Sequence, residues 1–153
     1  MTSAPCRRRS GSKTWIATLV LLLAGCQSHA AQADPIEAVL DQEFVLHGGQ
    51  QVAIRGADLR LRFADVLEDS RCPTEVECFW TGQARIAVDA ELGQGVPTSL
   101  EFNTNPAPGQ GKLTNDVGGY MVELKTLEPY PTTPDDSPEL TDYSATLSVR
   151  KSF

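Results

Sequence analysis

Cysteine, histidine and carboxylate side chains are the groups in this chain that could bind a metal ion or act in catalysis. The chain of 153 residues has four cysteines, two histidines and 20 acidic residues. A structural zinc site needs four ligands; beside Cys72 and Cys78 the only histidines are His29 and His47, and His29 lies in the expected tether rather than in the domain. His47 lies beside two glycines in a predicted turn, and no Gly-x-Ser-x-Gly sequence accompanies it. We therefore predict no metal site, no cofactor and no catalytic residue, so the protein is not expected to be an enzyme.

Residues 1–25 have the architecture of an export signal. Three arginines at positions 7–9 and Lys13 form a basic segment, and an apolar segment follows from Thr14 to Gly25. This apolar segment is shorter than the ~18–20 residues that a membrane-spanning helix needs. The pattern therefore predicts a signal peptide that is removed after export.

The sequence Leu23-Ala24-Gly25-Cys26 resembles the lipobox of bacterial lipoproteins. The resemblance implies cleavage before Cys26 and attachment of fatty acyl chains such as palmitate to that cysteine. The alternative is an ordinary cleaved signal that a cysteine follows by chance. Gln27, in place of the aspartate that commonly retains lipoproteins in the inner membrane, favours the outer membrane. The expected location is therefore the cell envelope, facing the periplasm if the cell has two membranes.

Export also determines the expected state of the other cysteines. Cys6 would leave with the signal and Cys26 would carry lipid, which leaves Cys72 and Cys78 as a pair in an oxidising compartment. We therefore predict one disulfide between them. It would close a loop of about seven residues and contribute roughly 2.4 kcal/mol to stability by the chain-entropy argument.

Removal of the signal makes the protein strongly acidic. Four of the 13 basic residues and none of the 20 acidic residues lie in residues 1–25, so residues 26–153 carry a net charge of −11. Nucleic-acid binding requires basic patches, so we expect no nucleic-acid partner. The acidic domain should also be repelled by anionic lipid headgroups, which leaves attachment to the membrane to the lipid on Cys26.

Alternation of apolar and polar residues predicts an all-β fold. Residues 26–36 are expected to be the lipidated cysteine and a tether, Ile36 to Leu40 a short helical turn, and residues 104–119 a loop. Residues 37–153 suit one antiparallel β-sandwich of about seven strands, with a small β-barrel as the alternative. The predicted strands are residues 43–46, 51–55, 59–67, 78–92, 98–103, 120–127 and 143–150.

The region around the two cysteines is the most distinctive part of the predicted domain. The segments Asp69-Ser70-Arg71-Cys72-Pro73 and Cys78-Phe79-Trp80-Thr81-Gly82 resemble a signature of small exported bacterial β-domain proteins without a settled activity. The resemblance implies a fold rather than a function. In the predicted strand 78–92, Trp80 shares the inward face with Cys78, so we expect a tryptophan buried beside the disulfide.

Two loops are the candidate recognition surfaces, because loops on a rigid β-scaffold commonly carry binding. One is the loop that the disulfide would hold, and the other is the segment Glu128–Asp142. This second segment has four prolines and several carboxylates but lacks the Asp-x-Asp-x-Asp-Gly spacing of a calcium loop. We interpret it as an acidic connector. The predicted partner-binding residues of the first loop are Pro73, Thr74, Glu75, Val76 and Glu77.

The sequence thus predicts a lipid-anchored envelope protein that works as a non-catalytic binding or interaction module. Its partners would be the membrane, through Cys26, and another envelope protein or external macromolecule. The main alternative is an inhibitor of a secreted hydrolase whose cleft receives the Cys72–Cys78 loop. An envelope enzyme is the less favoured third hypothesis.

Overall fold

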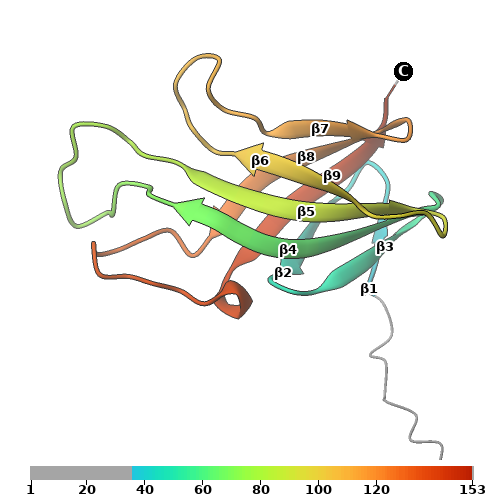
Figure 1. Ribbon diagram of the computed structural model, residues 1–153, viewed down its shortest axis with the longest axis horizontal. Coiled ribbons are helices and arrows are strands. Elements are labelled where there is room, and N and C mark those ends of the chain that lie inside the picture. Colours follow the sequence, from blue (N-terminus) through green and yellow to red (C-terminus); the bar gives the residue numbers. More distant parts are fainter. Residues whose placement is uncertain (1–35, 153) are drawn as a thin grey trace, which may run out of the picture. The chain divides into compact units, whose positions relative to one another are not determined.

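The computed structural model describes residues 36–152, which form two open β-sheets packed against each other as a sandwich (Figure 1). The predicted signal peptide and Cys26 lie outside the described residues. The five-stranded sheet has the order β1 (Ile36–Val39), β3 (Gln51–Arg55), β4 (Leu59–Asp69), β5 (Ala84–Leu92) and β6 (Thr98–Asn103). The four-stranded sheet has the order β2 (Glu43–His47), β9 (Ser144–Lys151), β8 (Tyr120–Glu128) and β7 (Thr114–Val117).

The predicted alternation of inward and outward residues is confirmed along the central strands. In β9, Ala145, Leu147 and Val149 are completely buried, and their polar neighbours face outward. The same parity buries Leu61 and Phe63 in β4. Because both sheets turn one apolar face inward, they form a single core between them. Its largest fully buried side chains are Phe63, Phe102, Leu46, Ile54, Leu59, Leu61, Ile86 and Leu147.

The described residues contain nine strands instead of the seven that we predicted. The segment Ile36–Val39 is a strand rather than a helical turn, and it pairs in parallel with β3, whereas every other strand pair is antiparallel. Ile36, the expected end of the tether, is thus already part of the sheet. The strand Thr114–Val117 lies inside the expected loop. Both strands have four residues and lie at sheet edges, so the alternation within them is too short to detect.

The longest predicted strand begins six residues later than expected, at Ala84 instead of Cys78. Gly82 interrupts it with a φ of +67°, a conformation that favours glycine. A Cβ atom at this position would also lie 1.8 Å from the backbone oxygen of Ser70. Residues 70–83 therefore leave the sheet as a loop between β4 and β5.

The strands and the core span nearly the whole of the described residues. Every core residue lies between Ala38 and Val149, and both sheets end by Lys151. A segment of residues 27–153 therefore contains every strand and core residue that the structure describes. Within residues 36–152, no helix has the length and apolar character needed to cross a membrane, and the only helix is the short 3₁₀ turn η1 (Leu140–Asp142).

Candidate functional site: the loop end of the sandwich

The two loops nominated from the sequence lie together at one end of the sandwich (Figure 1). We call residues 70–83 the disulfide loop and residues 129–139 the proline connector; together they form the loop end. The backbone N–H of Thr74 donates to the oxygen of Pro131 at 3.1 Å, and that of Glu75 donates to Thr132 at 3.1 Å. The sequence analysis treated these loops separately, but their backbones are joined into one surface.

The predicted disulfide between Cys72 and Cys78 is confirmed, and it closes the outer part of the disulfide loop. Two backbone hydrogen bonds hold the base of the loop. The N–H of Ser70 donates to the backbone oxygen of Gln83 at 2.8 Å, and the N–H of Cys72 donates to the backbone oxygen of Thr81 at 2.9 Å. The loop is thus fixed at its base by hydrogen bonds and farther out by a covalent bond.

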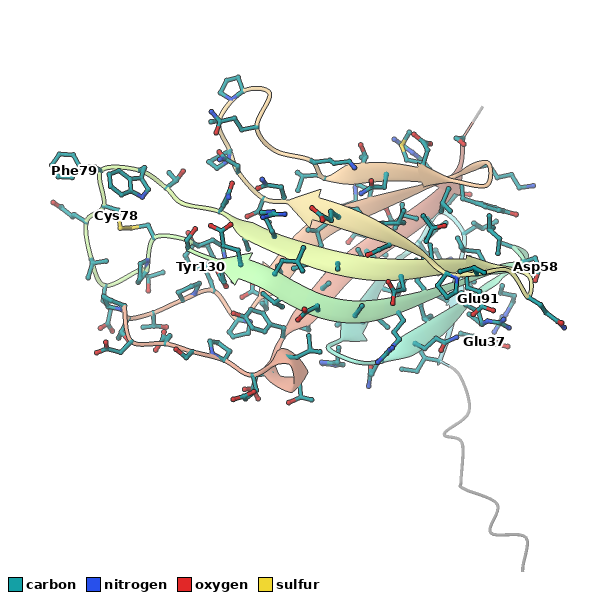
Figure 2. All side chains as sticks on the ribbon, in the orientation of Figure 1. Glu37, Asp58, Cys78, Phe79, Glu91 and Tyr130 are labelled. Atoms are coloured by element: carbon teal, nitrogen blue, oxygen red, sulfur yellow. A yellow bond between two sulfur atoms is a disulfide. The ribbon has the colours of Figure 1, made fainter. Side chains whose placement is uncertain are left out.

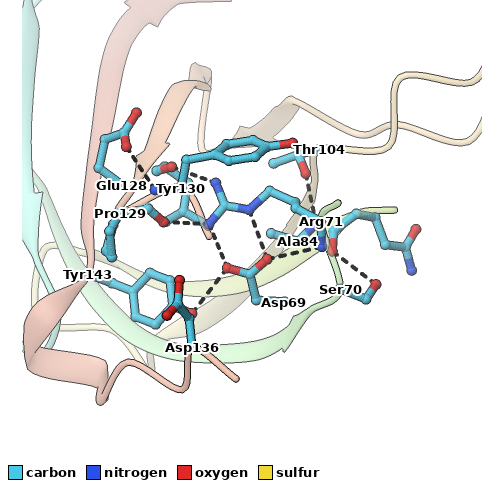
Figure 3. Close-up of polar contacts among 12 residues, drawn as sticks. Asp69, Ser70, Arg71, Ala84, Thr104, Glu128, Pro129, Tyr130, Asp136 and Tyr143 are labelled. Carbon is cyan, nitrogen blue, oxygen red and sulfur yellow. Dashed lines mark hydrogen bonds and ion pairs between the residues drawn. The ribbon is translucent and has the colours of Figure 1, made fainter. Parts of the chain in front are cut away.

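A buried ion pair between Asp69 and Arg71 lies beneath the loop end (Figure 3). The Arg71 guanidinium donates to Asp69 through Nε at 2.8 Å and through a terminal nitrogen at 2.5 Å. It also donates to the backbone oxygens of Leu127 and Pro129, both at 2.7 Å. The two side chains are only 7% and 9% exposed. One guanidinium thus ties the end of β4 to the end of β8 and the start of the proline connector.

Two tyrosines complete this network. The Tyr143 hydroxyl donates to Asp69 at 3.1 Å, and the Tyr130 ring lies 4.7 Å from the guanidinium carbon of Arg71. Burial, together with the negative charge of Asp69, raises the pKa of Tyr143 to about 12. The hydroxyl therefore remains a hydrogen-bond donor at any physiological pH. The sequence analysis identified neither this ion pair nor its tyrosine partners.

The tip of the disulfide loop carries two aromatic side chains in solvent. Phe79 is 102% exposed and Trp80 is 76% exposed, and Figure 2 shows Phe79 at the far end of the loop beside Cys78. The prediction of a buried tryptophan is therefore wrong. Because Gly82 breaks the strand, the alternation cannot be extended from Ala84 to Trp80, and the loop projects beyond the last core residues.

The predicted partner-binding residues are mostly available to solvent. Thr74, Glu75, Val76 and Glu77 are exposed, and Pro73 is half-buried. Pro73 lines a hollow of about 610 Å³ between the disulfide loop and the proline connector. A second hollow, of about 510 Å³, lies on the other side of the loop beside Trp80. The loop end therefore offers a projecting aromatic tip with a hollow on each side.

Two carboxylates in and just after the proline connector, those of Asp136 and Asp142, have structural partners. Asp136 accepts hydrogen bonds from the backbone N–H groups of Thr132 and Thr133 at 2.6 and 2.9 Å, and these bonds hold the pKa of its carboxyl below the usual value. Asp142 accepts from the N–H of Glu139 at 2.9 Å in the capping box of η1. Across residues 36–152, no group of three or more histidine, cysteine or carboxylate side chains is placed to hold a metal ion.

No protein-family model, curated protein or solved structure matches this chain. Function is therefore inferred from the geometry of the loop end.

Replacing both Cys72 and Cys78 with alanine should lower the free energy of unfolding by roughly 2.4 kcal/mol, because the unfolded chain regains the entropy of an open loop. The core lies outside the loop, so the sheet content should not change. Urea denaturation followed by circular dichroism measures both quantities. Thiol labelling of the unfolded parent domain should find no free cysteine among residues 27–153, and two reactive thiols would contradict the bond.

Proposed function

We propose that the protein is a lipid-anchored envelope protein whose loop end binds another macromolecule without catalysing a reaction. The observation that carries this proposal is the exposure of Phe79 and Trp80 on a loop that is held rigid. Such a surface is unfavourable unless a partner covers it, because large apolar side chains lose stabilisation in water.

Rigidity of the loop end supports a binding role on energetic grounds. A loop that is already ordered loses little conformational entropy when it associates, so more of the contact energy appears as affinity. The disulfide, the Arg71 network and the backbone bonds to the proline connector supply this order. Aromatic anchors of this kind are frequent among the residues that dominate binding energy at interfaces.

The charge of the domain favours a basic partner over a lipid surface. Glu75 and Glu77 flank Val76 within the disulfide loop, and Asp135 is exposed on the proline connector. These charges add to the net charge of −11 expected for residues 26–153. Association with a basic protein should therefore be faster at low salt, whereas anionic headgroups would repel the loop end.

Inhibition of a secreted hydrolase is the second candidate function. It is supported by the projecting shape of the disulfide loop, whose tip lies at the far end from the β5–β6 turn (Figure 2). A narrow, covalently closed loop could enter the cleft of an enzyme, and its fixed conformation would limit the entropic cost of entry.

The binding proposal predicts that the aromatic tip is required to capture a partner. Immobilised domain, residues 27–153, should retain specific proteins from envelope extract, and the change Phe79→Ala with Trp80→Ala should reduce their recovery by at least about tenfold. Val96→Ala is the matched control, because Val96 is 89% exposed in the β5–β6 turn at the other end of the sandwich. Quantitative mass spectrometry of the retained proteins compares the three forms.

Recovery that is equal for the parent and the aromatic variant would show that the tip is not the binding surface. Arg85 lies on the outward face of β5 and pairs with Glu101 at 3.0 Å. If Arg85→Ala abolished recovery, binding would be assigned to the face of the sheet instead. Inhibition is tested separately, by adding the domain to any hydrolase recovered and measuring its activity.

A further inference from the structure

The hollow beside Trp80 is lined entirely by uncharged residues, which is unusual in so acidic a domain. It lies between the disulfide loop and the loop that joins β6 to β7 (residues 104–113), and its volume is about 510 Å³. This value falls within the ~300–1,000 Å³ typical of small-molecule sites. Its polar side chains and its one aromatic residue are Ser70, Trp80, Thr81, Gln83, Asn105 and Gln110.

The amide side chains of this hollow form a connected network. The side-chain oxygen of Gln83 accepts from the Nδ2 groups of Asn103 at 3.1 Å and Asn105 at 3.2 Å. Asn105 also donates to the side-chain oxygen of Gln110 at 3.1 Å. The amides therefore hold one another in place across the two loops, and the Nε2 donors of Gln110 remain for a ligand.

Glu68 fixes the network from the side of β4. Its carboxylate accepts from the Ser70 hydroxyl at 2.8 Å and from Nε2 of Gln83 at 3.1 Å. These hydrogen bonds, with that from Ser70 the stronger cause, hold the pKa of Glu68 below its usual value. The charge is thus balanced by groups of the hollow and by the Arg85 guanidinium 4.0 Å away, and it orients Gln83 toward the neighbouring amides.

We propose that this hollow binds a neutral oligosaccharide, a ligand class that rests on the proposed binding function of the loop end. One face of a pyranose ring carries apolar C–H groups that can pack on an exposed indole such as Trp80, and its rim carries hydroxyls that both donate and accept hydrogen bonds. Amide side chains match such hydroxyls because they too donate and accept. An anionic ligand would be repelled by the domain, and a purely apolar ligand would cover the Nε2 donors of Gln110 without pairing them.

Trp80 provides a direct test because it is the only tryptophan in residues 27–153; the other tryptophan of the chain is Trp15. Its fluorescence should shift to shorter wavelength when a sugar covers the exposed ring. The probes are chitotetraose, which carries the N-acetyl groups found in envelope glycan strands, and cellotetraose, which lacks them. A stronger response to chitotetraose assigns the site to an envelope glycan, and a stronger response to cellotetraose assigns it to an external polysaccharide.

Variants test whether the residues of this hollow bind the sugar. Gln110→Ala keeps the fluorophore and should weaken sugar binding by about two- to tenfold. Trp80→Ala, measured by calorimetry, should weaken it by at least about tenfold. Gln94→Ala is the matched control, since Gln94 is an exposed amide residue in the β5–β6 turn that does not line the hollow. Circular dichroism checks that each variant keeps its sheets.

Two outcomes would overturn the oligosaccharide proposal. The first is that neither sugar shifts the fluorescence at millimolar concentration, and the second is an equal loss of sugar binding in Gln94→Ala and Gln110→Ala. If capture of a protein partner still depends on Phe79 in the first case, the loop end binds proteins alone. The proposed function would then stand without the oligosaccharide.

Discussion

Replacing Arg71 with alanine should lower the free energy of unfolding by about 3–5 kcal/mol. The change leaves the Asp69 carboxylate, which is only 9% exposed in the parent, without its cation. It also removes the guanidinium donors to the backbone oxygens of Leu127 and Pro129. A buried charge without a cation is costly, and the sandwich then offers Asp69 only the hydroxyl of Tyr143 and the backbone N–H of residue 71 as donors. Urea denaturation of the domain, residues 27–153, measures the loss.

The matched control for this prediction is an exposed arginine pair of comparable geometry. Arg55 contacts Glu37 at 2.6 Å, but the two side chains are 67% and 58% exposed. Water solvates both groups after Arg55→Ala, so this substitution should have little effect on stability. Equal losses for Arg55→Ala and Arg71→Ala would contradict the assignment of Arg71 as the buried connection of the loop end.

A second pair of variants distinguishes the cost of leaving the Asp69 charge unpaired from the cost of losing individual hydrogen bonds. Replacing Asp69 and Arg71 together with apolar residues of similar volume should recover much of the stability that Arg71→Ala loses, because no unpaired charge then remains buried. Tyr143→Phe removes one hydrogen bond to Asp69 and should cost only about 1 kcal/mol. A double variant no more stable than Arg71→Ala would show that the hydrogen bonds to Leu127 and Pro129 dominate instead.

The regular part of the fold was predictable from the sequence because long amphipathic strands repeat their pattern often enough to be recognised. β5 and β9 bury alternate residues as expected, and the turn at Gly48 and Gly49 follows β2. The edge strands β1 and β7 were missed because each has four residues and little core contact of its own. β1 is held mainly by its pairing with β3, a long-range property that local alternation does not contain.

The loop end shows where period-two reasoning fails. Trp80 continues the even-numbered face of β5 in the sequence, but the left-handed backbone at Gly82 ends that register before Trp80 is reached. A strand pattern that crosses a glycine should therefore be divided at that glycine before residues are assigned to the core.

The buried ion pair did leave a signal that the sequence analysis overlooked. Asp69 and Arg71 are two residues apart and continue the odd-numbered inward face of β4. Two bulges, at Phe63/Asp65 and Val66/Glu68, shift the register between that face and Asp69. The first bulge moves the inward-facing positions from odd-numbered to even-numbered residues, and the second moves them back to odd-numbered residues. Opposite charges on one inward face at the end of a strand indicate a paired, buried site. The partners contributed by β8 and the connector could not be found this way, because they come from distant parts of the chain.

Replacing Cys26 with serine should release the protein from the membrane almost completely. The proposed lipoprotein carries its acyl chains on this residue, and each methylene buried in the bilayer contributes about 0.8 kcal/mol. Two or three chains thus give an attachment that no surface contact of the domain could replace. The net charge of −11 expected for residues 26–153 adds repulsion from anionic lipids.

Detergent phase partitioning and metabolic labelling with palmitate test the anchor in whole cells. The parent should enter the detergent phase and carry label, and Cys26→Ser should do neither. Cys6→Ser is the matched control, since Cys6 lies in the segment that would be removed and its loss should change nothing. If Cys26→Ser remains as membrane-bound as the parent, the lipobox interpretation is wrong. The loop end would then have to be considered in a protein held to the envelope by some other means, because its geometry does not depend on the anchor.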